Sequence, residues 1–447
     1  MAIQSEAKRR LQRLARLRKI GVQKGAHEIS RPARSIQPAD PSVEDLHLPG
    51  EEVATPFGPA WVREVRYPLG EHEDLAEWLR VAPHTLAALD RNDLLIQLTP
   101  ARAAFIDTET TGLSLGAGTY TFLIGIGCYE FAHQGDALSG ETEGAFIVRQ
   151  FFMRHPGEER AQLHLVEEAL GRATGIVSFN GRGFDMPLVT NRFVLASMPP
   201  PLTGAPHLDL LPPARRLWKA RWGSCSLGSL ERNVLALQRT TEDVPGYLIP
   251  DIYRQYYLTG AANEMLARVF YHNLQDVVSM ALLGARMARY FRREEVGVFV
   301  ADLDAAECVS LGRCYDTLGW VEASARSYRA ALQRTTTADS QVLALRELSL
   351  LYKRQGWREQ AAELWEEWVS TVPGGDLTPY IELAKHHEWH TGELAAARGW
   401  AAWALRMAEE RPAGFEREDL VAQLQHRLAR LERKLAGVDL RGPDETE

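Results

Sequence analysis

The fold of this chain is decided by residues 103–130, which read AAFIDTETTGLSLGAGTYTFLIGIGCYE. The apolar run before Asp107 is typical of a buried strand, and residues 119–129 resume β character after a short turn. Alternate residues of a strand point to the same face, so Asp107 and Glu109 are expected side by side at the strand end. Two carboxylates held this close repel each other unless a cation lies between them. The stretch therefore predicts either a divalent metal site or a pair of hydrated surface acids.

Length and composition bound the class of protein. The 447 residues leave room for two or three domains of roughly 100–200 residues each. No apolar run approaches the ~20 residues that span a bilayer, and no apolar segment follows the charged N-terminus. We therefore expect a cytoplasmic protein with no membrane partner. The four cysteines lack the spacing of metal ligands and are expected to be free thiols.

Charge is divided unevenly along the chain. Residues 1–36 contain ten Lys or Arg and two Glu, a net charge of +8. Because the whole chain has a net charge of −8, the remaining residues carry −16. This basic segment favours either an arm that contacts phosphate or an acidic partner, or a solubilising tail. Residues 32–56 are rich in proline and acids, which predicts a linker. We therefore assign residues 1–56 to a basic arm and linker.

The later segments indicate an α/β fold. Residues 145–152 and 175–180 have the apolar content of strands, and residues 158–170 have the spacing of a helix. Residues 207–211 add one more strand before a pair of prolines. Three strands, a helix and further strands predict a mixed five-stranded sheet with flanking helices.

Two more acids stand at the ends of predicted elements. Asp185 follows a glycine-containing loop at a helix N-cap position, and Asn180 ends the strand before it. Asp276 lies in a helical segment, residues 263–291, four residues after His272 and thus on the same helix face. Each has a plain alternative: a cap, a residue that ties down its own loop, or a surface pair without a function.

Taken together, these motifs resemble the DEDD superfamily of 3′–5′ exonucleases on the ribonuclease-H-like fold. The surrounding residues resemble the YprB family: GLSLGAGTYTFLIGIG after the first acids, FNGRGFDMPL at the second motif and VPGYLIPDIYRQYYLTG before the third. The resemblance covers roughly residues 50–292. It implies two Mg²⁺ or Mn²⁺ ions held by Asp107, Glu109, Asp185 and Asp276.

The general base remains open between two neighbours. One type of these exonucleases has a tyrosine four residues before the last acid, and the other has a histidine five residues before it. Here the order is reversed, with His272 four and Tyr271 five residues before Asp276. We favour His272, because imidazole titrates near neutral pH, whereas a phenol loses its proton only near pH ~10.

The resemblance implies a two-metal hydrolysis of phosphodiester bonds at the 3′ end of single-stranded DNA or RNA. Oxygen ligands select hard ions, which activate water and stabilise the departing 3′-oxygen. His272 would deprotonate the attacking water. Residues 57–298 are accordingly assigned to a ribonuclease-H-like exonuclease domain. The residues expected to contact the substrate are Thr110, Gly112, Leu113 and Asn180.

The chain after residue 298 has a different character. Gly319, Gly356 and Gly392 recur at offsets of 37 and 36 within helical patterns, which resembles the ~34-residue tetratricopeptide repeat. We assign residues 299–438 to a tetratricopeptide-like domain that offers a surface to a protein partner, and residues 439–447 to a tail. An irregular helical bundle is the alternative.

Three functions compete on the sequence alone. They are a metal-dependent 3′–5′ exonuclease, a ribonuclease-H-type endonuclease and a non-catalytic nucleic-acid-binding scaffold. An endonuclease cuts circular single strands, whereas an exonuclease leaves circles intact and shortens linear strands. A scaffold has no use for the four acids, so we expect the exonuclease.

Overall fold

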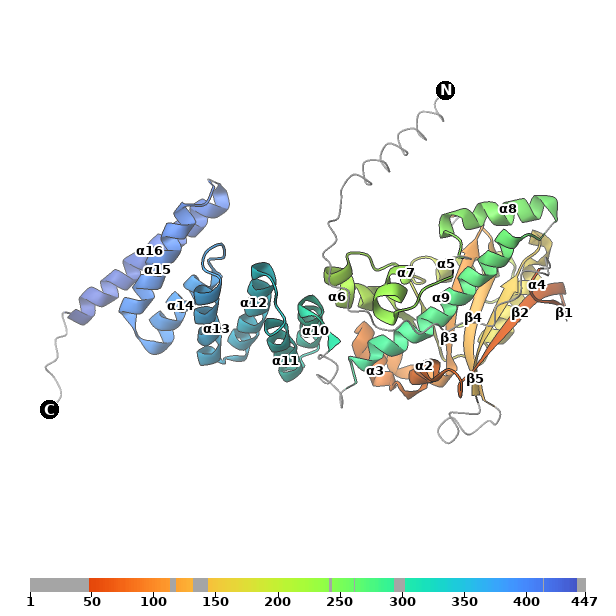
Figure 1. The fold of residues 1–447 in the computed structure, drawn as a ribbon, viewed down its shortest axis with the longest axis horizontal. Coiled ribbons are helices and arrows are strands. Elements are labelled where there is room, and N and C mark those ends of the chain that lie inside the picture. The colour runs from red at the N-terminus through yellow and green to blue at the C-terminus, as the bar shows by residue number, and fades with distance from the viewer. Residues whose placement is uncertain are drawn as a thin grey trace, which may run out of the picture.

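The computed structural model describes residues 48–112, 118–131, 144–240, 243–260, 262–292, 302–412 and 414–439. The basic arm, most of the predicted linker and tail, and Leu113 lie outside the described residues. A sheet with helices around it forms one end of the molecule, and a row of helices leads away from it (Figure 1).

A mixed sheet of seven strands, in the order β1-β2-β5-β4-β3-β6-β7, forms the centre of the first part. The strands are β1 (Glu51–Thr55), β2 (Gly58–Pro68), β3 (Ala103–Thr110), β4 (Thr121–Phe131), β5 (Gly144–Phe152), β6 (Gly175–Ser178) and β7 (His207–Asp209). Strands β3, β4 and β5 pair antiparallel in chain order, and β6 and β7 continue the sheet in parallel from β3. The predicted strands and the antiparallel return after the first acid pair are therefore confirmed.

The sheet has two strands more than the predicted five. Strands β1 and β2 form a hairpin that pairs antiparallel with β5. The prediction of a linker through residue 56 was thus wrong for residues 51–55. The edge strand β1 consists of acidic and half-exposed residues. An edge strand needs no continuous apolar run, so the sequence of β1 resembles that of a loop.

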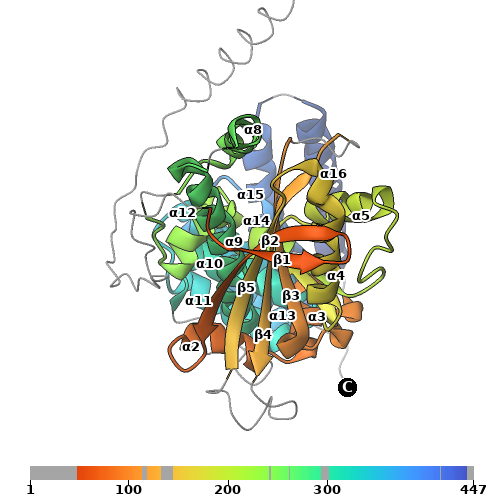
Figure 2. The same ribbon diagram turned by 90° about the vertical axis from the view of Figure 1, so that its right-hand side faces the viewer.

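Helices cover both faces of the sheet (Figure 2). Helices α4 (Glu159–Leu170) and α5 (Asp185–Leu195) cover one face, and the long helix α9 (Glu264–Arg289) covers the other. Along β3 the faces alternate: Ile106 packs with the α4 and α5 residues, whereas Phe105 packs with those of α9. The same alternation sends Asp107 and Glu109 to the α9 face and Thr108 to the α5 face.

Shorter elements complete this part of the chain. They are α2 (Glu73–Ala76), α3 (Pro83–Asp90), α6 (Leu211–Trp222), α7 (Leu227–Leu230), α8 (Ile249–Thr259), the π-helical turn η5 (Glu231–Leu235) and the 3₁₀ turn η6 (Gly246–Leu248).

Two glycines of β4 let α9 lie close to the sheet. A Cβ atom at Gly125 would lie 2.3 Å from the side-chain oxygen of Asn273, and one at Gly127 would lie 2.7 Å from Val277. Asn273 and Val277 belong to α9, and the ring of Phe146 in β5 lies closer still to an added Cβ at Gly127, at 2.5 Å. Because real Cβ atoms do not approach other atoms this closely, larger residues at these positions would push the helix outward.

The part that begins at residue 302 consists of helix pairs. The helices are α10 (Ala305–Thr317), α11 (Val321–Leu332), α12 (Ala338–Gln355), α13 (Arg358–Thr371), α14 (Thr378–His386), α15 (Leu394–Glu409) and α16 (Phe415–Asp439). Gly319, Gly356 and Gly392 each lie between the two helices of a pair, with φ of 71°, 76° and 76°. This left-handed conformation favours glycine, so the glycine period marks one turn per pair. The assignment of these pairs as tetratricopeptide repeats stays a prediction.

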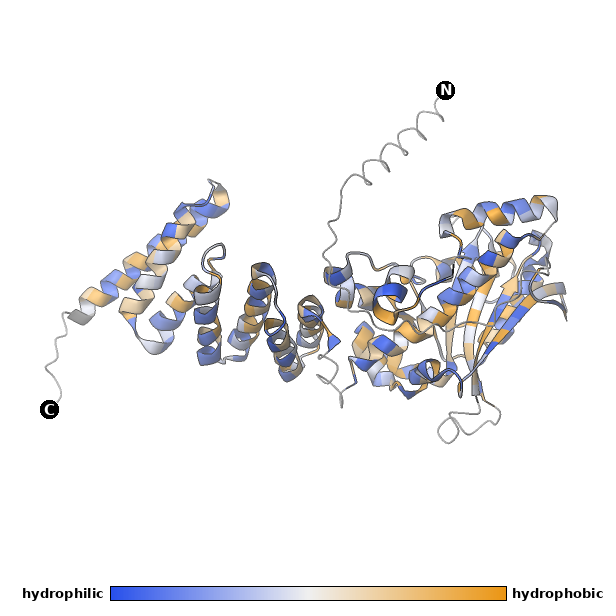
Figure 3. Ribbon diagram, in the orientation of Figure 1, coloured by the Kyte–Doolittle hydropathy of each residue, from blue (hydrophilic) through white to orange (hydrophobic). Residues whose placement is uncertain are grey.

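Apolar packing joins the two parts. One buried cluster extends from the sheet through α9 and α6 into α10 to α13. The rings of Phe291 and Tyr315 lie 5.9 Å apart across the junction, and Arg221 of α6 forms an ion pair of 2.5 Å with Asp304. Strands β4 and β5 are mostly apolar, whereas polar residues are frequent in the outer strands β1 and β2 and mix with apolar ones along the helices of the second part (Figure 3). Within the described ranges, no helix is long and apolar enough to cross a membrane.

The glycine contacts predict a position-specific loss of stability. Gly127→Ala should lower the free energy of unfolding by about 1–3 kcal/mol, because the added methyl group overpacks the space between β4, the Phe146 ring and Val277 of α9. Gly399→Ala is the control: it lies within α15 with no atom within 4 Å of an added Cβ. There alanine should stabilise the helix by about 0.5–1 kcal/mol. Urea unfolding followed by circular dichroism measures both, and equal effects would contradict the packing argument.

Candidate active site

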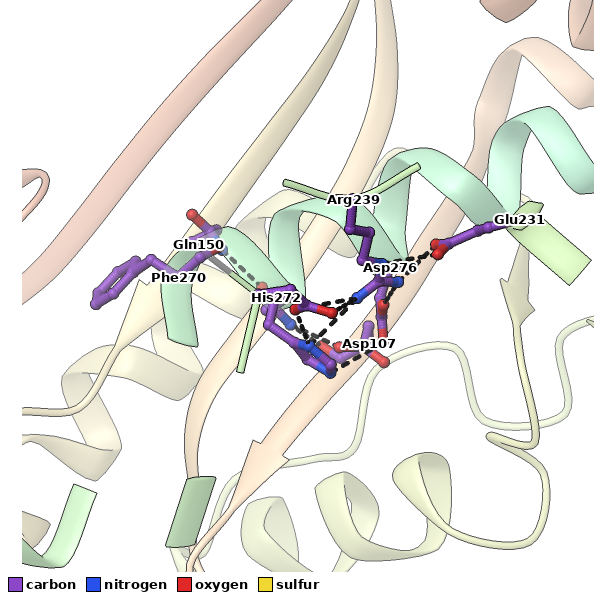
Figure 4. A network of polar contacts seen from close by, with 9 residues as sticks. Asp107, Gln150, Glu231, Arg239, Phe270, His272 and Asp276 are labelled. Carbon is purple, nitrogen blue, oxygen red and sulfur yellow. Dashed lines mark hydrogen bonds and ion pairs between the residues drawn. The ribbon is translucent and has the colours of Figure 1, made fainter. Parts of the chain in front are cut away.

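Asp107 and Glu109 of β3 lie within electrostatic range of Asp276 on α9, and Asp107 also lies within range of His272. Asn273 of α9 donates a hydrogen bond of 2.8 Å from Nδ2 to Oδ2 of Asp107. Asp276 lies one turn further along the same helix, and its charge acts on both Asp107 and Glu109. Asp107, His272 and Asp276 turn towards one another (Figure 4). The predicted same-face arrangement of the first acid pair is consistent with these contacts.

Removal from water, together with the crowding of negative charge, raises the pKa values of Asp107 and Glu109. For Asp107 the main cause is removal from water, and the charges of Asp276 and Asp185 raise its pKa further. The pKa of Glu109 is raised in the same way, by removal from water and by the charges of Asp107, Asp276 and Asp185. Burial raises the pKa of Asp185 to about 6. The four acids thus share one electrostatic environment that favours a proton or a cation.

Asp185 approaches the strand end from the other face of the sheet. Its Oδ1 accepts a hydrogen bond of 2.5 Å from the Thr108 hydroxyl, which points to the α5 face. The N-cap of α5 is Phe184, and Asp185 is the first helical residue. The predicted N-cap position was therefore wrong by one residue, because the side chain bonds to β3 and not to its own helix.

Asp209, which the sequence analysis did not single out, holds the loop before Asp185. Its carboxylate accepts hydrogen bonds from the backbone N–H groups of Asn180 at 2.8 Å and Arg182 at 3.2 Å. Asn180 has a φ of 69°. Its side-chain amide makes no hydrogen bond to the described residues and is free to contact a substrate. Asp209 is a single acid at the end of β7, and no local motif marks it.

His272 lies between two carboxylates. Its Nδ1 is 2.7 Å from Oδ1 of Asp243, and its Nε2 is 3.7 Å from Oδ2 of Asp276. Burial acts to lower the pKa of His272, but the hydrogen bond with Asp243 and the charge of Asp276 outweigh it, so the pKa is raised. The predicted pairing of His272 with Asp276 on one helix face is confirmed. An imidazole oriented by a carboxylate has the arrangement of a general base.

Tyr271, the alternative base, points elsewhere. Its hydroxyl oxygen accepts a hydrogen bond of 3.2 Å from the backbone N–H of Thr240. The two candidates therefore have different surroundings. Of the two, the imidazole of His272 contacts Asp276, and among the described interactions the phenol of Tyr271 does not.

Arg239 is the main residue that the sequence analysis missed. Its guanidinium forms ion pairs with Glu231 of η5, with Asp243 and with Asp276 of α9. Its Nη1 also lies 3.2 Å from Nδ1 of His272. One cation thus neutralises three acids from three segments. Nothing in the local sequence marks Arg239, because tertiary structure alone brings its partners together.

Two buried amide side chains form a chain of hydrogen bonds that holds Asp107 in place. Gln150 of β5 is fully buried, and its Nε2 donates to the Phe270 carbonyl at 2.7 Å and to Oδ1 of Asn273 at 2.9 Å. Asn273 in turn donates to Asp107. A glutamine within an otherwise apolar strand was the sequence signal for this chain of hydrogen bonds.

The donor set fits a hard divalent cation, since it consists of carboxylate oxygens under mutual repulsion. As the side chains lie, no three His, Cys, Asp or Glu residues of the described ranges are grouped to hold an ion. Asp276 is paired with Arg239, and Asp185 is bonded to Thr108. Holding two ions therefore requires these carboxylates to turn from their present partners.

The turn after β3 is closed by its own residues. The Thr110 hydroxyl donates a hydrogen bond of 2.7 Å to the Gly112 carbonyl. Thr110 is buried, so its side chain stabilises the turn, whereas Thr111 and Gly112 are partly exposed. A cavity of about 630 Å³ borders the site. It is lined by Asp276, by His272 and by residues between 227 and 246.

Comparisons with known proteins extend this description to the whole chain. Residues 104–288 match the RNase_H superfamily. The chain is also 31% identical over 392 residues to a protein of Bacillus subtilis (strain 168) named "Uncharacterized protein YprB", covering 83% of this chain and 86% of that protein. A match of this extent reaches beyond the sheet into the helix pairs. The chain therefore belongs to the YprB family and carries an RNase_H superfamily domain at its centre.

Proposed function

We propose that this protein is a metal-dependent 3′–5′ exonuclease that hydrolyses the phosphodiester bonds of single-stranded DNA or RNA. The RNase_H superfamily domain indicates a nucleic-acid-processing hydrolase. The observation that carries the finer proposal is the shared environment of four acids, in which burial and then the charges of Asp276 and Asp185 raise the pKa of Asp107. Such crowding is disfavoured unless it serves to bind cations.

Asp107, Glu109, Asp185 and Asp276 would hold two Mg²⁺ or Mn²⁺ ions. When bound, the ions would lower the pKa of the attacking water and stabilise the departing 3′-oxygen. Asn273 and Gln150 keep Asp107 oriented towards α9. The ligand roles follow the order of the family motifs and the charge coupling described above.

His272 acts as the general base in this proposal. Its Nδ1 is engaged by Asp243, so Nε2, on the side of Asp276, receives the proton from the attacking water. Asp243 then stabilises the imidazolium through the same hydrogen bond. The Asn180 amide and the backbone around Gly112 contact the terminal nucleotide, and the proposed contact of Leu113 lies outside the described residues.

Degradation of end-labelled oligonucleotides tests the activity. With Mg²⁺ or Mn²⁺, the protein should shorten linear single strands from the 3′ end and leave circular ones intact. Asp107→Asn should lower the rate by about 10²–10³-fold or more, the scale of a lost electrostatic group in an active site. Asp251→Asn, which removes an exposed acid of α8, is the control and should retain full activity. Cutting of circles, or no shortening of DNA or RNA, would refute the exonuclease proposal.

The identity of the base can be tested separately at saturating Mn²⁺. His272→Ala should lower kcat by about 10²–10⁴-fold, the usual contribution of a general base. Tyr271→Phe removes a hydroxyl that contacts only backbone among the described interactions, and most of the activity should remain. The reverse ranking of the two variants would assign the base to Tyr271.

Stability against pH tests the cation site without relying on activity. The pKa of Asp107 is raised well above its ordinary value of 3.8, so its ionisation costs folding stability as the pH rises through the folded-state pKa. In EDTA, Asp107→Asn should therefore melt at a higher temperature than the wild type at pH 8. The difference should vanish towards pH ~4, below which both side chains are uncharged.

Addition of Mn²⁺ at pH 8 should then raise the melting temperature of the wild type and leave that of Asp107→Asn nearly unchanged, because a ligand stabilises only the state that binds it. A difference between the two proteins that does not depend on pH, or equal shifts with Mn²⁺, would count against the site.

A further inference from the structure

The cavity beside Asp276 has the size of a ligand site. Its volume of about 630 Å³ lies within the range of roughly 300–1,000 Å³ typical of small-molecule pockets. Its walls come from α7 and η5, from the segment that leads through Arg239 to Gly246, and from α9. Because His272 and Asp276 form one wall, whatever enters the cavity lies directly beside the proposed site of hydrolysis.

One positively charged side chain of the cavity lining is available to bind an anion. The charged residues of the lining are Glu231, Asp243 and Asp276 with Arg232 and Arg239. Arg239 is shared among all three acids. The exposed side chain of Arg232 makes no hydrogen bond or ion pair with the described residues. Arg232 is therefore the lining cation whose guanidinium can take a phosphate group.

An exposed aromatic residue adjoins the cavity. Gly246 belongs to the lining, and Tyr247 follows it in η6 with 77% of its surface exposed. Core packing does not account for a ring in this position. In proteins that bind single strands, exposed aromatic rings serve as stacking platforms for unpaired bases, and cationic side chains contact the phosphates. A base inside a duplex is already stacked and paired, so such a platform favours a single strand.

We propose that this cavity binds an unpaired nucleotide of a single-stranded substrate, with Arg232 on its phosphate and Tyr247 stacked on its base. The inference rests on the proposed function, because it takes the strand to run from the four acids into the cavity. It adds two substrate-binding residues, Arg232 and Tyr247, that lie outside the family motifs.

Binding of a fluorescently labelled single-stranded oligonucleotide, measured by anisotropy in EDTA, tests the inference without turnover. Tyr247→Ala should weaken binding by about 5- to 150-fold, the contribution of one stacked base, and Tyr247→Phe should restore it. Arg232→Ala should weaken binding and reduce the slope of log K against log salt by about 0.7, the value for one phosphate of a single strand. A duplex of the same sequence should bind more weakly and be insensitive to Tyr247→Ala.

Two variants of α8 serve as matched controls. Arg254 is exposed and Tyr257 has 52% of its surface exposed, and both belong to α8, which contributes none of the described lining residues, whereas the turn of Tyr247 contributes Gly246. Arg254→Ala and Tyr257→Ala should leave the affinity within twofold of the wild type. Equal losses in the cavity and control variants, or wild-type binding by Arg232→Ala and Tyr247→Ala, overturn the inference.

The outcomes also separate this inference from the proposed function. A protein that binds through Arg232 and Tyr247 but shortens no strand retains the cavity assignment and loses the exonuclease. A protein that shortens strands while both variants bind like the wild type retains the exonuclease and loses the cavity assignment.

Discussion

The close packing of α9 on the central strands is the contact on which the candidate site depends. Gly125 and Gly127 remove the side chains that would hold the helix away from β4. Asn273 enters the space above Gly125 and reaches Asp107. The same helix then carries His272 and Asp276 to the end of β3. The absence of side chains at these two positions of β4 thus determines which polar groups of α9 reach the neighbouring strand β3.

This packing gathers negative charge where water is scarce, and the protein offsets it only in part. Arg239 shares one positive charge among three carboxylates, and Asn273 and Thr108 supply hydrogen bonds to Asp107 and Asp185. The pKa values of Asp107 and Asp185 nevertheless remain raised. A fold selected for stability alone would replace such acids with neutral residues, so their retention here is an argument for function.

The parts of the site that follow from local periodicity could be predicted from the sequence. The two-residue period of β3 placed Asp107 and Glu109 on one face, and the helical period placed His272 beside Asp276. Arg239 could not be found in this way: Asp243 lies four residues on, but Glu231 and Asp276 lie eight and 37 residues away on other elements, and no sequence pattern links them. The β1–β2 hairpin was missed for a different reason: an edge strand with a solvated face lacks the apolar run that marks a central strand.

The helical part also bears on the site, although it contributes no side chain to the cavity lining. Helix α10 packs on α6, and the ion pair between Arg221 and Asp304 joins them. The chain continues from α6 through α7 into η5, and these two elements form the cavity wall that carries Arg232. Because the buried cluster is continuous across the junction, the helix pairs brace this wall from outside. The junction also reaches α9 directly, because the Tyr315 hydroxyl of α10 donates a hydrogen bond to the carbonyl of Tyr290, the residue that ends α9.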